Sequence, residues 1–208
     1  MTTTVVMAKA PVPGRVKTRL CPPCTPEQAA ALAAAALVDT LGAVQATACD
    51  RRVLALDGAP GPWLPPGWAV VPQSGGGLAA RLDAAVVAID GPVLVVGMDT
   101  PQVTPKLLDA AWARLLAPDT DAVLGPADDG GYWAIGVRAP RAGLFDDVEM
   151  STTRTGAQQR ARLRALVLSV AELDRLRDVD TFADAQAVAA HIPSSRFAHQ
   201  LARTRVAA

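Results

Sequence analysis

The segment V-L-V-V-G-M-D-T-P, Val93–Pro101, lies in the middle of a 208-residue chain and carries its clearest structural signal. Its first four residues form a continuous apolar run, which is typical of a central parallel strand because such a strand is buried on both faces. Gly97 ends the run, and Asp99 places a carboxylate directly after it. Ligands of open α/β sheets bind beyond the carboxyl ends of the strands. The stretch therefore predicts both the sheet and the edge that carries a site.

Shorter apolar runs alternate with helix-start signals on both sides of this strand. T-P-E-Q at Thr25–Gln28 predicts a capped helix, and Thr104-Pro105 predicts another. The alternation predicts an α/β fold, with a mostly parallel mixed sheet in a three-layer α/β/α, Rossmann-like arrangement. The expected strands are 3–8, 52–56, 68–72, 93–96, 122–125, 132–137 and 166–170, and the expected helices are 25–46, 78–89, 104–116, 151–164 and 181–190.

Residues 1–192 are expected to form one domain. Within it, the region 122–137 is expected to add a hairpin or an antiparallel strand to the otherwise parallel sheet. The helix before the last strand is expected to be capped by Ser151 or Thr152. Residues 193–208 are polar and basic, and they are expected to form a mobile tail.

The chain carries 20 basic and 20 acidic residues, so its formal net charge is zero, and half of its residues are hydrophobic. A balanced charge argues against a nucleic-acid binder, whose phosphate contacts need a basic face, and the apolar fraction excludes a disordered chain. No run approaches the roughly 18 apolar residues of a membrane span, and the N-terminus does not resemble a signal peptide. We expect a cytoplasmic protein without nucleic-acid or membrane partners, and its oligomeric state stays open.

The three cysteines make an odd number, which fits a reducing compartment. Cys21-Pro22-Pro23-Cys24 forms a C-x-x-C directly before an expected helix, a position that lowers the pKa of a thiol. A redox role is therefore one alternative, but incidental cysteines in a proline-rich loop are favoured. A zinc site is disfavoured because the chain has no second C-x-x-C and its two histidines lie far away in the sequence.

The first loop, K-A-P-V-P-G-R-V-K-T-R-L at Lys9–Leu20, concentrates positive charge. It carries four cations, including two of the three lysines in the chain, and the first acidic residue is Glu27. A proline–glycine turn after a strand exposes backbone N–H groups, and arginine and lysine suit phosphate oxygens. The loop predicts a site for a di- or triphosphate, and four solvated surface charges are the alternative. The candidate nucleotide-binding residues here are Lys9, Pro11, Gly14, Arg15, Lys17, Thr18 and Arg19.

A second, weaker nucleotide-binding candidate is the run Ser74–Gly77 before an expected helix. Its glycines Gly75, Gly76 and Gly77 would let the backbone approach a base or ribose, and a flexible helix entry is the alternative.

Carboxylates suited to a metal ion follow two later segments. Magnesium binds through one or two carboxylates plus substrate phosphates, and Asp99 lies at the end of the central strand. A capping role for Asp99 is the alternative, although Thr104 already supplies the next cap. The motif D-V-D-T at Asp178–Thr181 offers a second ligand if Asp180 points inward, and otherwise either aspartate caps the last helix.

The motif D-D-G-G-Y-W at Asp128–Trp133 combines two acids, two glycines and the only tyrosine in the chain. Carboxylates and an aromatic ring beside a closely approaching backbone suit the wall of an acceptor pocket. A plain hairpin turn is the alternative. The candidate acceptor residues are Asp128, Asp129, Gly130, Gly131 and Tyr132.

Taken in order, these motifs resemble an uncharacterised bacterial family of the nucleotide-diphospho-sugar transferase (GT-A-like) superfamily, whose members are often labelled glycosyltransferases. K-A-P-V-P-G-R-V-K-T-R-L is similar to the family's first motif, and G-M-D-T-P, A-D-D-G-G-Y-W-A-I-G and D-V-D-T are similar to its later ones. More distantly, the first loop resembles those of phospholactate and molybdenum-cofactor guanylyltransferases. The resemblance implies that Lys17 and Arg19 hold phosphates and that Asp99 and Asp180 bind Mg²⁺ or Mn²⁺. The family's G-D-L-G is G-G-L-A here, at Gly76–Ala79, and its D-V-D-T-P-E-D-L is D-V-D-T-F-A-D-A.

We therefore expect a magnesium-dependent transferase that uses a nucleoside triphosphate or a nucleotide sugar, with Lys17, Arg19 and Asp99 as catalytic residues. Nucleotidyl transfer to a small phosphate- or carboxylate-bearing acceptor, with release of pyrophosphate, is favoured. The chain is short for a large acceptor domain, and it has G-x-D where sugar transfer in this superfamily typically uses D-x-D. Glycosyl transfer from a nucleotide-diphosphate sugar is the alternative, and a non-catalytic nucleotide-binding protein is a further one.

Overall fold

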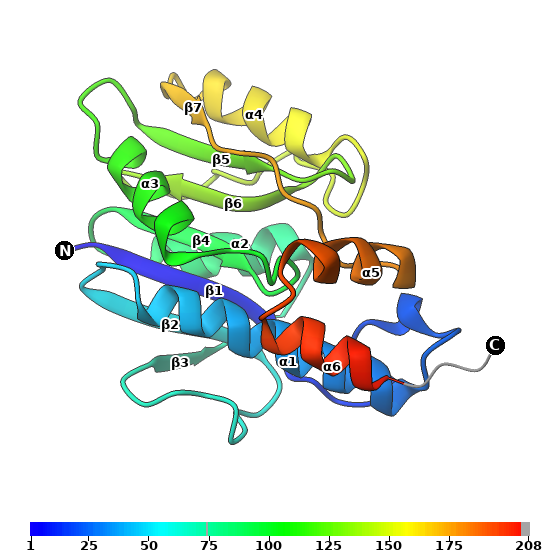
Figure 1. Cartoon of the computed structure of the whole chain (residues 1–208). Helices are drawn as coiled ribbons and strands as arrows, with labels where there is room; N and C mark the ends of the chain where they lie inside the picture. Colours follow the sequence, from blue (N-terminus) through cyan, green and yellow to red (C-terminus); the bar gives the residue numbers. More distant parts are fainter. Residues whose placement is uncertain (74, 205–208) are drawn as a thin grey trace.

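A seven-stranded sheet forms the centre of the molecule (Figure 1). The computed structural model describes residues 1–73 and 75–204. The strands are β1 (Thr3–Lys9), β2 (Arg51–Asp57), β3 (Ala69–Pro72), β4 (Val93–Gly97), β5 (Ala122–Pro126), β6 (Tyr132–Val137) and β7 (Val170–Glu172). Their order in the sheet is β3-β2-β1-β4-β6-β5-β7.

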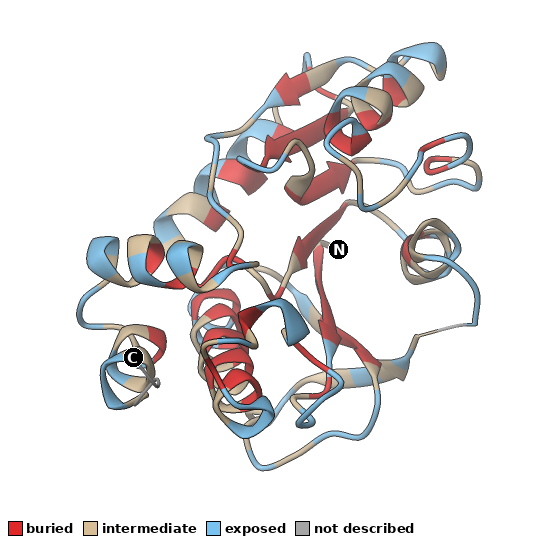
Figure 2. Cartoon of the chain, turned by 90° about the vertical axis from the view of Figure 1, so that its right-hand side faces the viewer, coloured by how far each residue is buried: buried red, intermediate tan, exposed pale blue. Residues whose placement is uncertain are grey.

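Helices cover both faces of this sheet, which confirms the expected three-layer α/β/α arrangement (Figure 1). The helices are α1 (Pro26–Gln45), α2 (Leu78–Val87), α3 (Pro105–Leu115), α4 (Thr155–Ala165), α5 (Phe182–His191) and α6 (Arg196–Arg203), with a short 3₁₀ turn, η1, at Thr18–Leu20. Because neighbouring strand residues point to opposite faces, Val6 packs with α1 and α3, and Val5 packs with α2 and α4. Figure 2 shows the buried residues gathered in the strands and along α1.

The parallel strands β1, β2 and β4 end at the same edge of the sheet. Lys9 lies opposite Asp57, and Met7 lies opposite Gly97, in the strand register. The loop after β1, the end of β2 and Asp99 after β4 are therefore brought together by pairing alone. Helix α1 connects the loop after β1 to β2 along the chain. It starts where the sequence predicts, because Thr25 and Gln28 form the expected capping box.

The expected antiparallel strand is present, but it lies inside the sheet. β6 pairs antiparallel with both β4 and β5. Gly136 allows this close packing, since a Cβ atom there would lie 2.8 Å from the Val123 side chain and 3.0 Å from that of Leu115. The insertion moves the 126–132 turn next to the end of β4, beside Asp99.

The structure corrects two expected boundaries after residue 150. Helix α4 begins at Thr155 and has no side-chain cap, so Ser151 and Thr152 are not its caps. The last strand is Val170–Glu172 and not 166–170. Val167 has a positive φ of 59° and is 90% exposed. The apolar run at 166–170 therefore forms the turn that follows α4, and not a strand.

The expectation of a mobile tail is wrong for residues 196–203, which form α6. Ser195 caps this helix, Phe197 is 1% exposed, and the Asp39 carboxylate on α1 accepts the N–H groups of Arg196 and Phe197. A single aromatic anchor in a polar stretch gives too little hydrophobic periodicity to predict a helix. Residues 205–208 of the expected tail lie outside the described part of the chain.

By length and composition alone, α1 is apolar enough to cross a membrane, and no other described helix is. In the fold, its residues belong to two hydrophobic clusters, one with the sheet and one with α5 and α6. A core helix of a soluble protein passes the same test.

Candidate active site

Two adjoining cavities open at the carboxyl edge of the parallel strands. We call the first the loop cavity, about 360 Å³ beside the loop after β1, and the second the hairpin cavity, about 550 Å³ beside β6. Five residues line both of them, so the cavities meet at one junction. The shared residues are Met7, Arg19, Leu78, Asp99 and Asp180.

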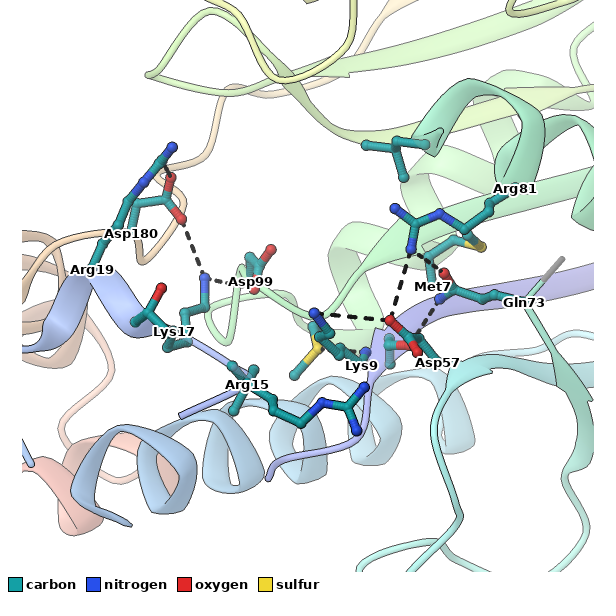
Figure 3. Close-up of a pocket in the computed structure, with 15 residues that line it drawn as sticks. Met7, Lys9, Arg15, Lys17, Arg19, Asp57, Gln73, Arg81, Asp99 and Asp180 are labelled. Atoms are coloured by element: carbon teal, nitrogen blue, oxygen red, sulfur yellow. Dashed lines mark hydrogen bonds and ion pairs between the residues drawn. The ribbon is translucent and has the colours of Figure 1, made fainter. Parts of the chain in front are cut away.

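The loop cavity collects most of the predicted nucleotide-binding residues. Of these, Lys9, Arg15, Lys17, Thr18 and Arg19 line it, and Figure 3 shows the four cationic ones around it. Pro11 and Gly14 do not line the cavity. They shape the turn, where Gly14 has a φ of +73° that favours glycine.

Lys17 is the most enclosed cation of the loop, with 9% of its side chain exposed. Its ammonium lies 2.6 Å from Asp99 and 3.3 Å from Asp180 (Figure 3). It also donates a hydrogen bond to the Val179 carbonyl. Burial works to lower the pKa of Lys17, but the two carboxylates raise it above its ordinary value, so the side chain stays charged. The loop cations have no acidic partner within their own segment, yet in the fold Lys17 and Arg19 are ion-paired.

The expected metal ligands Asp99 and Asp180 are brought together around Lys17. No three His, Cys, Asp or Glu side chains of the described residues lie close enough to form a preassembled metal cluster. However, oxygens of Asp99, Asp180 and Val179 converge on one ammonium group, so this point accommodates a cation. Such oxygens are the ligands that Mg²⁺ and Mn²⁺ prefer. The donor set therefore fits a divalent ion completed by substrate phosphates, provided that Lys17 gives up its position.

The far wall of the loop cavity consists of residues that the sequence did not single out. Arg81 on α2 donates to Gln73 at 3.0 Å and lies 3.9 Å from Asp57, which also lies 3.9 Å from Lys9 (Figure 3). The Arg81 Nε atom is buried without a hydrogen-bond partner. A signal for Asp57 was available, because the parallel register places the end of β2 beside the end of β1. Arg81 gave no such signal.

The glycine run is at the entrance to α2. Gly75, Gly76 and Gly77 are exposed and do not line either cavity, whereas Leu78 lines both. Ser74 lies outside the described residues.

Part of the predicted acceptor motif lines the hairpin cavity. Asp129, Gly131 and Tyr132 line it, but Asp128 does not, because it pairs with Arg177 at 3.1 Å. Gly130 also lies outside the lining. Its φ is +89°, and an added Cβ would lie 2.1 Å from the Thr153 carbonyl oxygen. The turn therefore packs closely against the segment that precedes α4.

Asp178 also lines the hairpin cavity, although the sequence favoured only its neighbour Asp180 as a ligand. Burial, together with the charges of Asp129, Asp99 and Asp180, raises the pKa of Asp178 to about 7. Burial likewise raises the pKa of Tyr132. The capping alternative is wrong for both aspartates of the D-V-D-T motif, since Thr181 is the N-cap of α5.

The redox alternative loses its physical basis in the structure. All three cysteines are free, and Cys24 is buried. Burial and the neighbouring Cys21 raise the pKa of the Cys24 thiol, which is the opposite of what a reactive thiolate needs.

Solved structures with the same arrangement of elements identify the fold class. One, from Desulfovibrio desulfuricans G20, is called a "putative nucleotide-diphospho-sugar transferase"; it has a TM-score of 0.86 and 25% identity, over 97% of this chain and 94% of that one. Rv0371c of Mycobacterium tuberculosis H37Rv, in complex with manganese, has a TM-score of 0.55 and 23% identity, over 90% and 96%. A CMP:2-keto-3-deoxy-manno-octonic acid synthetase complexed with CTP has a TM-score of 0.59 and 10% identity, over 92% and 98%. The chain thus has the nucleotide-diphospho-sugar transferase fold, of the GT-A-like type.

Within this fold class, the chain belongs to the bacterial family described as "Uncharacterized protein conserved in bacteria (DUF2064)", whose pattern matches residues 29–152. The match covers more than half of the chain and confirms the expected membership in an uncharacterised bacterial family. It includes Asp99 and the acceptor motif, and it leaves the cationic first loop outside. No curated protein matches the chain in sequence.

Proposed function

We propose that this chain is a divalent-metal-dependent transferase that moves a nucleotidyl group from a nucleoside triphosphate to a small acceptor. The observation that carries the proposal is the junction of the two cavities, which is lined by Arg19, Asp99 and Asp180. A triphosphate in the loop cavity and an acceptor in the hairpin cavity would meet at this junction. The shared fold with a synthetase that binds CTP and with a protein that binds manganese supports this assignment.

In the proposed reaction, an acceptor oxygen attacks the α-phosphorus and forms the new bond. The bond from the α-phosphorus to the bridging oxygen breaks, and pyrophosphate leaves with its electron pair. A hydroxyl acceptor releases its proton to water. Lys9, Arg15 and Arg19 would neutralise phosphate charge as it shifts, so that catalysis is mainly positioning and electrostatic stabilisation. A divalent ion held by Asp99 and Asp180 would supply further positive charge to the phosphates.

Glycosyl transfer is the second candidate, because the 25%-identical neighbour is called a "putative nucleotide-diphospho-sugar transferase". In that reaction a nucleotide sugar occupies the loop cavity, and the acceptor oxygen attacks the anomeric carbon. A nucleoside diphosphate then leaves in place of pyrophosphate, so the leaving group distinguishes the two reactions.

The test is a thermal-shift screen of nucleoside triphosphates and nucleotide sugars, with and without Mg²⁺ or Mn²⁺, followed by assays of pyrophosphate and nucleoside diphosphate release. We expect metal-dependent stabilisation by a triphosphate that disappears in Asp99→Asn and persists in Asp90→Asn, an exposed control. Stabilisation by nucleotide sugars alone would favour glycosyl transfer. Binding without product would indicate the non-catalytic alternative, and no binding would contradict the proposal.

A further inference from the structure

We propose that the hairpin cavity accepts a molecule that carries no anionic group and donates hydrogen bonds through hydroxyl or amine groups, with Asp129 and Asp178 as the residues that select it. The inference rests on the proposed function only for the role of this cavity as the acceptor site. It departs from the phosphate- or carboxylate-bearing acceptor that the sequence predicts, because the sequence did not show which charges gather there.

The charges that line the hairpin cavity are mostly negative. Four carboxylates line it, and Arg19 is its only cationic lining residue in the described part of the chain. Arg19 is paired with Asp180 at 2.9 Å, and Lys17 pairs with both Asp99 and Asp180. Asp129 and Asp178 form no ion pair with any described residue, although the charge of Lys17 still acts on Asp178. An anionic acceptor would meet their repulsion in a partly enclosed space, where charges are weakly screened.

The two aspartates also keep capacity to accept hydrogen bonds. One oxygen of Asp129 accepts the N–H of Gly131 at 2.8 Å. Asp178 is half-buried in the cavity lining and makes no hydrogen bond or ion pair with any described residue. An ionised carboxylate can only accept hydrogen bonds, so its oxygens are left to water or to a ligand that donates. A ligand with hydroxyl or ammonium groups can take the place of that water.

The rest of the lining suits a molecule with one apolar face. Leucine, valine, isoleucine and methionine side chains form one part of the wall, and hydroxyl side chains form another. A volume of about 550 Å³ is in the range of small-molecule sites. A sugar or cyclic polyol combines a C–H face with hydroxyl edges in this way. The apolar residues include Leu78, Leu82, Val95, Val96, Ile135 and Met150, and the hydroxyl residues are Ser151, Thr152, Thr153, Thr155 and Tyr132.

A cysteine probe measures the charge selectivity without knowledge of the acceptor. Ser151→Cys places a thiol in the lining of the cavity, and Cys21→Ser and Cys49→Ser remove the other accessible thiols. The variant is treated with three methanethiosulfonate reagents, which carry a trimethylammonium, a neutral or a sulfonate group. After correction for their rates with a free thiol, we expect the cationic reagent to react at least about tenfold faster than the anionic one. The ratio should fall with added salt and with Asp129→Asn plus Asp178→Asn. Thr18→Cys in the loop cavity is the matched control, with the opposite preference.

An equal or faster reaction of Ser151→Cys with the anionic reagent would overturn the proposal. An acceptor panel of glucose, glucosamine, glucose 6-phosphate and glucuronate, with the donor found by thermal shift, then separates hydroxyl from amine acceptors. We expect turnover of the first two to exceed that of the last two at least about tenfold in kcat/KM, and the reverse order would also overturn the proposal. If none of the four reacts, the thiol-reagent ratio decides. If no nucleotide binds but the charge preference holds, the proposed function fails and the inference about the cavity stands.

Discussion

The loop cavity and the hairpin cavity share a boundary but have opposite charge. The loop cavity is lined by five lysine and arginine side chains and three aspartates, whereas the hairpin cavity is lined by four aspartates and one arginine. The first has cations suited to a polyphosphate, and the second has an apolar wall and carboxylates without ion pairs. Under the proposed function, this contrast would keep an anionic donor and an uncharged or cationic acceptor in separate cavities that meet only at the junction lined by Asp99 and Asp180.

The largest effect is expected where the two cavities meet. Asp99→Asn removes a negative charge from the point that pairs with Lys17 and would hold the metal ion. We expect the rate of pyrophosphate release to fall about 10³-fold, a size typical of the loss of a key electrostatic group. A rate comparable to that of Asp90→Asn would show that the junction is not the reaction centre.

Lys17→Met tests whether the ammonium and a metal ion compete for one position. Loss of the ammonium leaves Asp99 and Asp180 facing each other, and we expect turnover to fall about 10²-fold. In the absence of nucleotide, the affinity for Mn²⁺, followed by electron paramagnetic resonance titration, should instead rise several-fold because the competing cation is gone. Lys106→Met, on the exposed side of α3, should change neither quantity. Weaker Mn²⁺ binding by Lys17→Met would contradict the competition.

Gly130→Ala should disturb the hairpin cavity alone. Its Cβ would collide with the Thr153 carbonyl, and its φ of +89° disfavours an L side chain. We expect the free energy of unfolding to fall by about 2 kcal/mol in urea titrations, with a raised KM for the acceptor and an unchanged Kd for the nucleotide. Gly42→Ala in α1, where a Cβ meets nothing within 4 Å, should stabilise the protein by up to about 1 kcal/mol. A matching rise in nucleotide Kd in Gly130→Ala would show that the cavities are not independent.

The smallest effect concerns the loop cavity alone. Arg81→Gln removes a cation from the far wall and its contacts with Gln73 and Asp57. We expect the Kd of the nucleotide, measured by calorimetry, to rise about tenfold, because one charge-assisted contact is lost. The charge preference of Ser151→Cys should not change. Arg164→Gln, at an exposed position of α4, is the control. A nucleotide Kd equal to that of the control would remove Arg81 from the donor site.

Features that depend on residues close together in the sequence were mostly predicted, and those that depend on distant residues were mostly missed. The Thr25 cap, the buried β4 and the carboxylate after it depend on neighbouring residues, and each is where the sequence predicts. The mobile tail was wrong because Phe197 is held by long-range packing against α1 and α5. The strand at 166–170 was wrong for a local reason, since Val167 is exposed with a positive φ and its N–H donates to the Arg164 carbonyl at the end of α4. Arg81 was missed because a lone arginine on a helix carries no local signature.

The alternating α/β architecture, the cationic loop after β1 and the carboxylates after later segments could all be read from the sequence, because hydrophobic periodicity, helix caps and the order of charges depend on neighbouring residues. How these charges combine depends on the folded arrangement. It paired Lys17 with Asp99 and Asp180, inserted β6 beside β4, and placed Asp129 and Asp178 in the hairpin cavity without ion pairs. Electrostatic energy depends on distances between side chains up to 163 residues apart in the chain, and only the folded sheet fixes those distances.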